Sequence, residues 1–238
     1  MLTLGYSEYI IQAGDIGHLI ARTMASNYNP HCKALHTNSA LPAEPTAESH
    51  PELHAKIQNT PLTDSEKESI IRTATISKDG MTYYQQLSTR PQTLGYSLTD
   101  SPVGILAWIH EKLHDWTDNY PWTDDEILTC VTIHYFSTAG AAAPGSVYYA
   151  MEHSSPGALV EAQKYVDVPL GIARFAKDLV LLPRLWNQTL GRVVSESEYA
   201  RGGHFAAWEC PTEIVGDVRA MFGRGGTVSG CVDGRDGV

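Results

Sequence analysis

Hydrophobic and polar positions predict a strand, a sharp turn and a helix at the start of the chain. The β-rich stretch 8–12 (Glu-Tyr-Ile-Ile-Gln) leads into small residues, and the segment 18–25 has apolar positions at 20, 21, 24 and 25 that fit one helical face. Residues 32–40 then suit a returning parallel strand. This βαβ order predicts an α/β fold with a mostly parallel sheet flanked by helices.

The same fold class is indicated near the other end of the chain. Apolar residues alternate over 166–172 and recur over 192–195, which predicts two more strands with a short helix between them. Pro211 opens an amphipathic helix that ends near residue 222. The stretch 223–238 is rich in glycine and poor in apolar residues, so we expect it to be disordered.

The middle of the chain has a helical pattern. Prolines at 42, 45, 51 and 61 favour a loop from Leu41 to about Thr63. Helical patterns follow at about 63–88, 101–118, 123–138 and 144–153, with Thr63 or Asp64 and then Thr123 as candidate N-caps. We therefore predict an all-helical insertion at 42–159 within a core formed by 1–41 and 160–222.

One stripe of the helix expected at 101–118 is mainly apolar. Ile105, Trp108, Ile109, Lys112 and Leu113 lie near one another on the helical surface. A stripe of this kind is more typical of core packing than of a binding surface.

Composition narrows the possible partners and location. Lysine and arginine number 17 against 27 acidic residues, and a net charge of −10 argues against a nucleic-acid partner. Neither a membrane-spanning apolar run nor a signal peptide is recognisable, so we expect a cytoplasmic protein. The four cysteines are far apart and form neither a zinc motif nor a disulfide framework, which favours buried or free thiols.

Asp15 is the first candidate for chemistry. It lies between Gly14 and the pair Ile16-Gly17, and small flanking residues allow a tight strand-to-helix elbow that presents a nucleophile above a sheet. The simpler alternative is an aspartate that caps the following helix. For an isolated Gly-Asp-x-Gly, that alternative is favoured.

His204 and Asp178 could complete a catalytic group with Asp15. His204 lies in a glycine-rich loop between a predicted strand and the last helix, and Asp178 follows the strand that begins at residue 166. An acid is needed to orient a histidine that works as a base. Nucleophile, acid and histidine occur here in the chain order of α/β-hydrolase enzymes.

Several segments resemble the microsomal-type epoxide hydrolases, and in particular their fungal members. YIIQAGDIGHLIARTMA resembles their nucleophile elbow, TRPQTLGYSLTDSPVGILAWIHEKLHDWTD resembles their cap domain, and KDLVLLPRLW with YARGGHFAAWECP resembles their acid and histidine segments. The matches run in order from about residue 4 to residue 222. The resemblance implies a partial α/β-hydrolase fold in which residues 42–159 form a helical cap.

The resemblance also implies a reaction and a set of residues. Asp15 attacks an epoxide carbon to form an alkyl ester, and His204, oriented by Asp178, activates the water that hydrolyses the ester to a diol. The backbone N–H of Ile16 serves the oxyanion hole, and cap tyrosines protonate the opening ring: Tyr83 first, with Tyr148 or Tyr149 second. Periodicity alone would give these tyrosines an amphipathic surface role. A small hydrophobic epoxide and water are the implied substrates, and no metal or organic cofactor is implied.

Three features depart from the family. Ile16 replaces a tryptophan and His18 replaces a serine. The sequence contains no His-Gly-x-Pro, the loop that supplies the second oxyanion donor, and its loss corresponds to about a hundredfold in rate. Because the strands that precede the elbow in the family are also absent from this sequence, we expect the first strand to form an exposed sheet edge that promotes homodimers or other self-association.

These departures leave other functions open. One is a catalytically impaired or silent, truncated homologue, or a ligand-binding remnant. Another is a different Asp-nucleophile hydrolase such as a dehalogenase, although the indole donor that such an enzyme needs beside Asp15 is absent.

Overall fold

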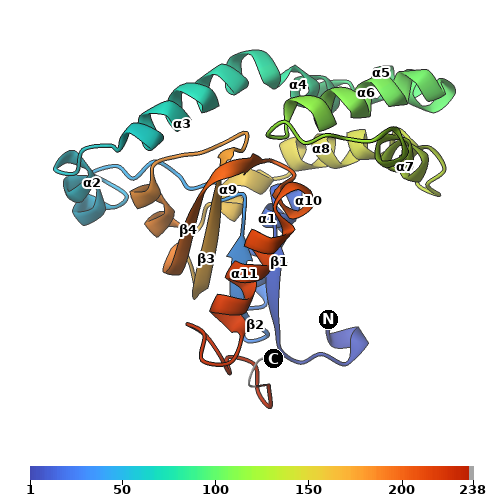
Figure 1. Cartoon of the computed structure of the whole chain (residues 1–238). Coiled ribbons are helices and arrows are strands. Elements are labelled where there is room, and N and C mark those ends of the chain that lie inside the picture. Colours follow the sequence, from blue (N-terminus) through green and yellow to red (C-terminus); the bar gives the residue numbers. More distant parts are fainter. Residues whose placement is uncertain (236–238) are drawn as a thin grey trace.

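Four parallel strands form the centre of the molecule. The computed structural model describes residues 1–235, and within them the sheet has the order β1 (Tyr9–Ala13), β2 (Cys32–Thr37), β3 (Val166–Lys177) and β4 (Gly191–Gly203). The predicted α/β class is therefore confirmed. All four strands point their carboxyl ends toward the helical cap (Figure 1).

The two faces of the sheet have separate cores. The side chains of Leu170 and Ile172 on β3 join a cluster with helix α1 (Asp15–Asn27), whereas Ala173 and Phe175 join a cluster with α10 (Ala206–Glu209) and α11 (Pro211–Phe222). This alternation follows from the two-residue period of a strand. Helix α1 and α11 consequently lie on opposite faces of the sheet (Figure 1).

Helix α1 is anchored to the core by an arginine. Arg22 is 1% exposed and donates to the carbonyls of Ala162, Lys164 and Leu190 at 3.0, 2.6 and 2.5 Å. The buried stripe of α1 is thus centred on His18, Ala21, Arg22 and Ala25, while Ile20, which the periodicity placed on the inner face, is exposed. Burial of the charge lowers the pKa of Arg22 to about 10.

His18, the residue that replaces serine, also packs into the core. Its Nδ1 lies 3.0 Å from the hydroxyl of Thr37 on β2. Burial and the neighbouring charge of Arg22 lower the pKa of His18 to about 3, so the ring is neutral. His18 therefore helps to seat α1 on the sheet.

The cap consists of helices inserted between β2 and β3, and it lies across the carboxyl edge of the sheet (Figure 1). Capping boxes at Thr63 and Thr123 start two of these helices; the sequence predicts Thr123, and of its two candidates for the other helix, Thr63 and Asp64, the cap is Thr63. The bounds are α2 (Pro51–Gln58), α3 (Asp64–Thr75), the π-helical turn η2 (Ile76–Gly80), α4 (Thr82–Thr89), α5 (Pro91–Asp100), α6 (Pro102–Asp115), α7 (Asp124–Tyr135) and α8 (Ala143–His153).

Two cap helices were not predicted. Helix α2 forms inside the expected loop, and α5 forms in the gap between predicted helices. Each begins at a proline, Pro51 and Pro91, in the first helical position, where a missing N–H costs nothing. The single helix expected at 63–88 is instead divided by the π-helical turn.

Connections near the end of the chain also differ in detail. Helix α9 (Ala158–Ala162) spans the boundary expected at residues 159 and 160, and it packs near α1. The short helix expected between the last two strands is the 3₁₀ helix η3 (Arg184–Thr189). Another 3₁₀ turn, η1 (Leu2–Leu4), precedes β1. Within residues 1–235, every helix is too short or too polar to span a bilayer.

The glycine-rich end is hydrogen-bonded where disorder was expected. In the described part, 223–235, the N–H groups of Thr227 and Val228 donate to carbonyls at the end of α11, and the N–H of Asp233 donates to the carboxylate of Glu8 at 2.8 Å. Hydrogen bonds of this segment to α11 and to Glu8 thus hold it in place, although it has few apolar side chains to bury. Residues 236–238 lie outside the described residues.

Candidate active site

The nucleophile candidate lies on a strained turn between β1 and α1. Asp15 has a φ of 49°, which is unusual for a residue with a side chain and is tolerated where a turn demands it. A Cβ on Gly14 would lie 2.8 Å from Oδ1 of Asn38, whose side chain accepts from Gln12 at 3.0 Å. Glycine at position 14 is thus required by this close approach.

The histidine loop follows β4 and is fixed by the cap. The N–H of His204 donates to the carbonyl of Trp116 at 2.7 Å, and the N–H of Gly202 donates to the carboxylate of Asp118 at 3.0 Å. Gly202 has a φ of 90°, and a Cβ on Gly203 would lie 2.5 Å from the Trp116 carbonyl. Glycine is therefore needed at position 202 for its left-handed backbone and at position 203 for the close approach of the cap segment.

The structure brings the three predicted catalytic residues together. Nδ1 of His204 lies 2.9 Å from Oδ1 of Asp178, and Nε2 of the same ring lies 3.7 Å from Oδ1 of Asp15. Asp178 is 3% exposed, and its Oδ1 also accepts from the N–H of Leu179 at 2.7 Å. One buried imidazole is held between an orienting carboxylate and a carboxylate that faces a cavity.

The charges around His204 set its basicity. Burial lowers the pKa of the imidazole, but the hydrogen bond and charge of Asp178, together with the charge of Asp15, outweigh burial and raise the pKa above 6.5. The ring is therefore a stronger base than a free histidine. Trp116 and Phe205 shield it, with ring centroids 5.3 and 5.4 Å from that of His204.

Two tyrosines of the cap face the nucleophile across the same cavity. The cavity has a volume of about 610 Å³, and its lining includes Asp15, His204, Tyr83 from α4 and Tyr148 from α8. Burial, Tyr148 and the charge of Asp15 raise the pKa of Tyr83, and burial with the charge of Asp15 raises that of Tyr148 to about 12. Both hydroxyls are consequently protonated donors near neutral pH.

The third tyrosine candidate lies elsewhere. Tyr149 is 44% exposed and stacks on His153 at a centroid distance of 4.0 Å, outside the lining of this cavity. Of the two alternatives left open by the sequence, the geometry thus favours Tyr148. Successive helical positions point about 100° apart, so only one of the pair can face the nucleophile.

Sequence reasoning missed other residues of the site. Tyr84 lines the cavity and donates to Glu152 at 2.8 Å, and Trp116 covers the imidazole. Nothing local in the sequence marks them, because their role depends on how α4, α8 and the segment after α6 meet the core.

The first turn of α1 could serve an oxyanion. The N–H groups at a helix start have no acceptor within the helix, and that of Ile16 directly follows Asp15. Carboxylate, imidazole, phenol and backbone N–H groups at this spacing have the chemistry of a two-step hydrolase that uses a covalent ester.

Known proteins resemble this chain in sequence and in fold. No protein-family model matches the chain. Epoxide hydrolase 1 of Sus scrofa is 32% identical over 94% of the chain, and the structure of the Aspergillus niger epoxide hydrolase is 34% identical over 92% of it with a TM-score of 0.75. Over the residues that it matches, this chain belongs to the epoxide hydrolase family. The juvenile hormone epoxide hydrolase of Bombyx mori is similar in structure, with 27% identity over 92% of the chain and a TM-score of 0.79.

The similarity to the epoxide hydrolase family covers part of each relative. The chain spans about half the length of the curated relatives it matches; for the Sus scrofa protein the share is 52%. It also covers 53% of the chain in the Aspergillus niger structure. These relatives confirm that the fold is that of the α/β-hydrolases.

Gly14→Ala tests the elbow. We expect it to destabilise the protein by about 1–3 kcal/mol, because the new methyl group overlaps Asn38. Urea unfolding measures this loss. The matched control is Gly17→Ala, whose Cβ meets nothing closer than 3.7 Å. In an Asn38→Ala background the cost of Gly14→Ala should fall, and an undiminished cost would contradict the overlap.

Titration of His204 tests the electrostatics. By NMR, the imidazole should titrate above pH 6.5. Asp15→Asn should lower this pKa, and Asp178→Asn should lower it further, because each removes a charge that favours the imidazolium. Since the base must be neutral, ester hydrolysis should slow as the pH falls through the imidazole pKa. A pKa insensitive to Asp15→Asn would refute the coupling.

Tyr148→Phe and Tyr149→Phe form a matched pair on adjacent positions. We expect Tyr148→Phe to slow epoxide opening at least tenfold, since it removes a hydroxyl donor, and Tyr149→Phe to change the rate less than about twofold. Single-turnover kinetics measures both rates. Equal effects of the two substitutions would contradict the assignment.

Proposed function

We propose that the protein hydrolyses epoxides to vicinal diols through an ester on Asp15. The observation that supports this most strongly is the alignment of Asp15, His204 and Asp178, with ring-nitrogen to carboxylate distances of 3.7 and 2.9 Å, beneath two protonated tyrosines. Similarity to epoxide hydrolases over 92% of the chain supports the same reaction.

The first step opens the ring. An oxygen of the Asp15 carboxylate forms a bond to one epoxide carbon, and the carbon–oxygen bond of the ring breaks. The departing oxygen takes a proton from Tyr83 or Tyr148, whose hydroxyls line the same cavity. Asp15 is suited to the attack because the elbow exposes 57% of its side chain.

The second step releases the diol. His204 removes a proton from water, and the resulting hydroxide attacks the ester carbonyl of Asp15. The carbonyl oxygen gains negative charge beside the N–H of Ile16, and the imidazolium is stabilised by Asp178 at 2.9 Å. When the intermediate collapses, the bond between the Asp15 carbonyl carbon and the substrate oxygen breaks, the departing alkoxide takes the proton of the added hydroxyl, and the carboxylate of Asp15 is restored as the diol leaves. The imidazolium proton of His204 then returns, through water, to the phenolate left by the first step.

Variant proteins can separate these steps. With styrene oxide as substrate, His204→Gln should accumulate the ester, seen as one added substrate mass on the intact protein, while Asp15→Asn should form neither ester nor diol. Asp178→Asn should form the ester and hydrolyse it slowly. Absence of diol with the unaltered protein, together with absence of ester in His204→Gln, would reject the proposal.

The cavity makes a dehalogenase less suitable. Such an enzyme would need indole donors for a halide beside the nucleophile, and the residue after Asp15 is Ile16. The tyrosine pair instead supplies proton donors, which an opening epoxide requires and a departing halide does not.

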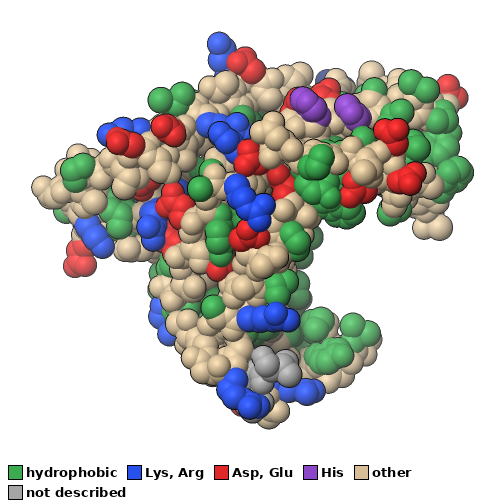
Figure 2. Space-filling model, in the orientation of Figure 1, with side chains coloured by type: hydrophobic (Ala, Val, Ile, Leu, Met, Phe, Trp, Pro, Cys, Tyr) green, Lys and Arg blue, Asp and Glu red, His purple; other side chains and the backbone are tan. Residues whose placement is uncertain are grey.

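The edge of the sheet supports a proposal about assembly. Within the described residues β1 has a paired neighbour on one side, and the exposed hydrophobic side chains Leu2, Leu4, Tyr6 and Ile10 lie on or next to it. Hydrophobic side chains gather around the N-terminal segment in Figure 2. An edge of this kind favours pairing with a second copy, so we propose a homodimer or larger assembly. The cytoplasmic location predicted from the sequence likewise stays a proposal.

Ile10→Lys tests this assembly. A charge on the edge strand should lower the mass measured by light scattering toward that of one chain, whereas Ile71→Lys, on an exposed position of α3, should not. A monomer before any substitution would contradict self-association.

A further inference from the structure

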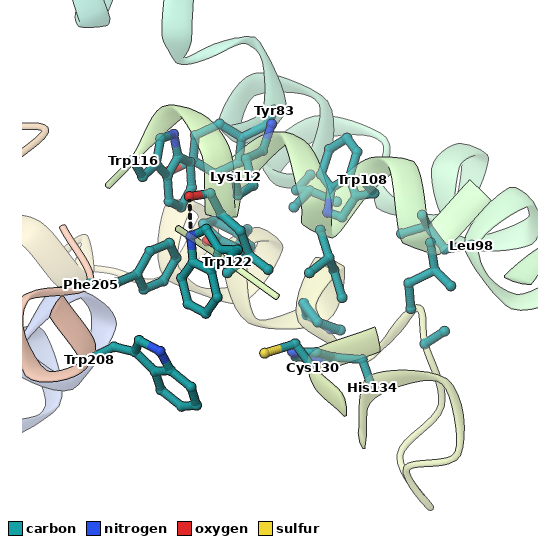
Figure 3. A pocket seen from close by; sticks show the side chains of 18 residues that line it. Tyr83, Leu98, Trp108, Lys112, Trp116, Trp122, Cys130, His134, Phe205 and Trp208 are labelled. Atoms are coloured by element: carbon teal, nitrogen blue, oxygen red, sulfur yellow. Dashed lines mark hydrogen bonds between the residues drawn. The ribbon is translucent and has the colours of Figure 1, made fainter. Parts of the chain in front are cut away.

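A second cavity lies between the cap helices and the segment at α10, beyond the tyrosines. Its volume is about 290 Å³, and it shares the side chains of Tyr83 and Tyr148 with the catalytic cavity. Four tryptophans, Trp108, Trp116, Trp122 and Trp208, line it together with Phe205 (Figure 3). We refer to this cavity as the aromatic chamber.

The walls of the aromatic chamber suit a flat apolar group. Most of its lining is carbon. Trp122 packs edge-on against Phe205 and tilted against Trp208, at centroid distances of 6.4 and 5.5 Å, and Trp116 stacks on Phe205 at 6.0 Å. An enclosed apolar cavity of about 150 Å³ binds benzene. The aromatic chamber therefore has room for roughly two fused aromatic rings.

Lys112 places a positive charge at the wall of this chamber. Its side chain is 14% exposed, and Nζ lies 4.8 Å from the centroid of Trp108, 5.1 Å from that of Tyr83 and 5.7 Å from that of Trp116. The ammonium also pairs with Glu111, whose side chain is 60% exposed. Among the chamber-lining residues of the described chain, Lys112 is the only Lys, Arg, Asp or Glu.

These features carry one inference about substrate selection. We infer that the aromatic chamber binds a flat aromatic arm of the epoxide without positive charge, and that Lys112 excludes arms that carry a cation. The inference rests on the proposed function and specifies the substrate class of that site.

The position of the tyrosines explains how one substrate can occupy both cavities. An epoxide has two carbons, and their substituents point away from the ring oxygen. With that oxygen at Tyr83 and Tyr148, one substituent can extend over Asp15 and the other into the aromatic chamber, since both tyrosines belong to both linings. The chamber also contacts the base, because Trp116 and Phe205 pack against His204.

Charge selection follows from the low exposure of Lys112. The ammonium of Lys112 is mostly shielded from solvent, and its partner Glu111 lies outside the chamber lining, so the chamber wall presents the positive end of this pair to a second cation, whereas the π faces beside it attract neutral rings. A substrate arm that carries a neutral oxygen acceptor or a carboxylate meets no negatively charged side chain in the described lining of the aromatic chamber. Discrimination against cationic arms should consequently disappear when the ammonium of Lys112 is removed by substitution.

Intrinsic fluorescence offers a direct test, because four of the five tryptophans line the aromatic chamber. The probes are 2-naphthamide, 2-naphthoate and 2-naphthylmethylammonium, which share a two-ring arm and differ in charge. We expect saturable quenching by the amide and the carboxylate, with a Kd at least tenfold weaker for the ammonium. Trp186→Phe removes the tryptophan outside the chamber and should keep the quenching.

Lys112 is tested by two substitutions. Lys112→Met should reduce the preference against the ammonium probe to less than threefold, and Lys112→Arg, which keeps the charge, should preserve it; circular dichroism checks that both variants are folded. If Lys112→Met does not fold, Lys112→Gln takes its place. Selectivity that persists without the charge would overturn the role of Lys112, and absence of saturable quenching by all three probes would overturn the chamber as a binding site.

The binding test is independent of turnover. Asp15→Asn should bind 2-naphthamide as the unaltered protein does, because Asp15 lies outside the aromatic chamber. Binding without any hydrolysis of styrene oxide would reject the proposed reaction and leave the chamber assignment intact. Hydrolysis without binding would reject the assignment alone.

Discussion

The hydrogen bond between His204 and Asp178 is the constraint on which the site depends. At 2.9 Å it fixes which nitrogen of the imidazole faces the buried acid, and so turns the other nitrogen toward Asp15. Asp178 directly follows β3, His204 directly follows β4, and Asp15 follows β1. Because these strands are parallel and end at one edge of the sheet, their topology brings the three positions together.

The elbow and the histidine loop are strained features that the surrounding packing must hold. Asp15 has a positive φ and is the first residue of α1. The buried guanidinium of Arg22 on α1 donates to the carbonyl of Ala162, at the end of α9, and to that of Leu190, directly after η3. The loop at Gly202 and Gly203 is similarly held by the cap segment 116–118. The cap thus positions the imidazole of His204 directly, in addition to lining the cavity over Asp15.

Patterns in the sequence predicted much of the core and the positions of the catalytic candidates. Four strands, the helix after Pro211 and the caps at Thr63 and Thr123 follow from local periodicity and capping chemistry, and the structure contains them. Helices α2 and α5 were missed. Pro51 was interpreted as a residue that prevents a helix, although proline is also favoured in the first helical turn, where Pro91 likewise starts α5. Tyr148 could not be separated from Tyr149, nor Trp116 and Lys112 recognised as cavity residues, because these roles depend on packing between helices far apart in the sequence. The stripe that contains Trp108 and Lys112 was expected to be core: Ile105 and Leu113 are buried in the core of the cap, and the stripe also lines a cavity, which its periodicity does not indicate.

The proposed reaction requires that Asp15 itself becomes alkylated by the substrate and that water attacks the resulting ester carbonyl, the step for which His204 is positioned. A single turnover in ¹⁸O-labelled water, followed by mass spectrometry of the peptide containing Asp15 and of the product, tests this most directly. The account predicts one ¹⁸O atom in the carboxylate of Asp15 and none in the first diol released, because the diol keeps an oxygen of the carboxylate. Label in the first diol and none at Asp15 would show direct attack of water on the epoxide and would contradict the account.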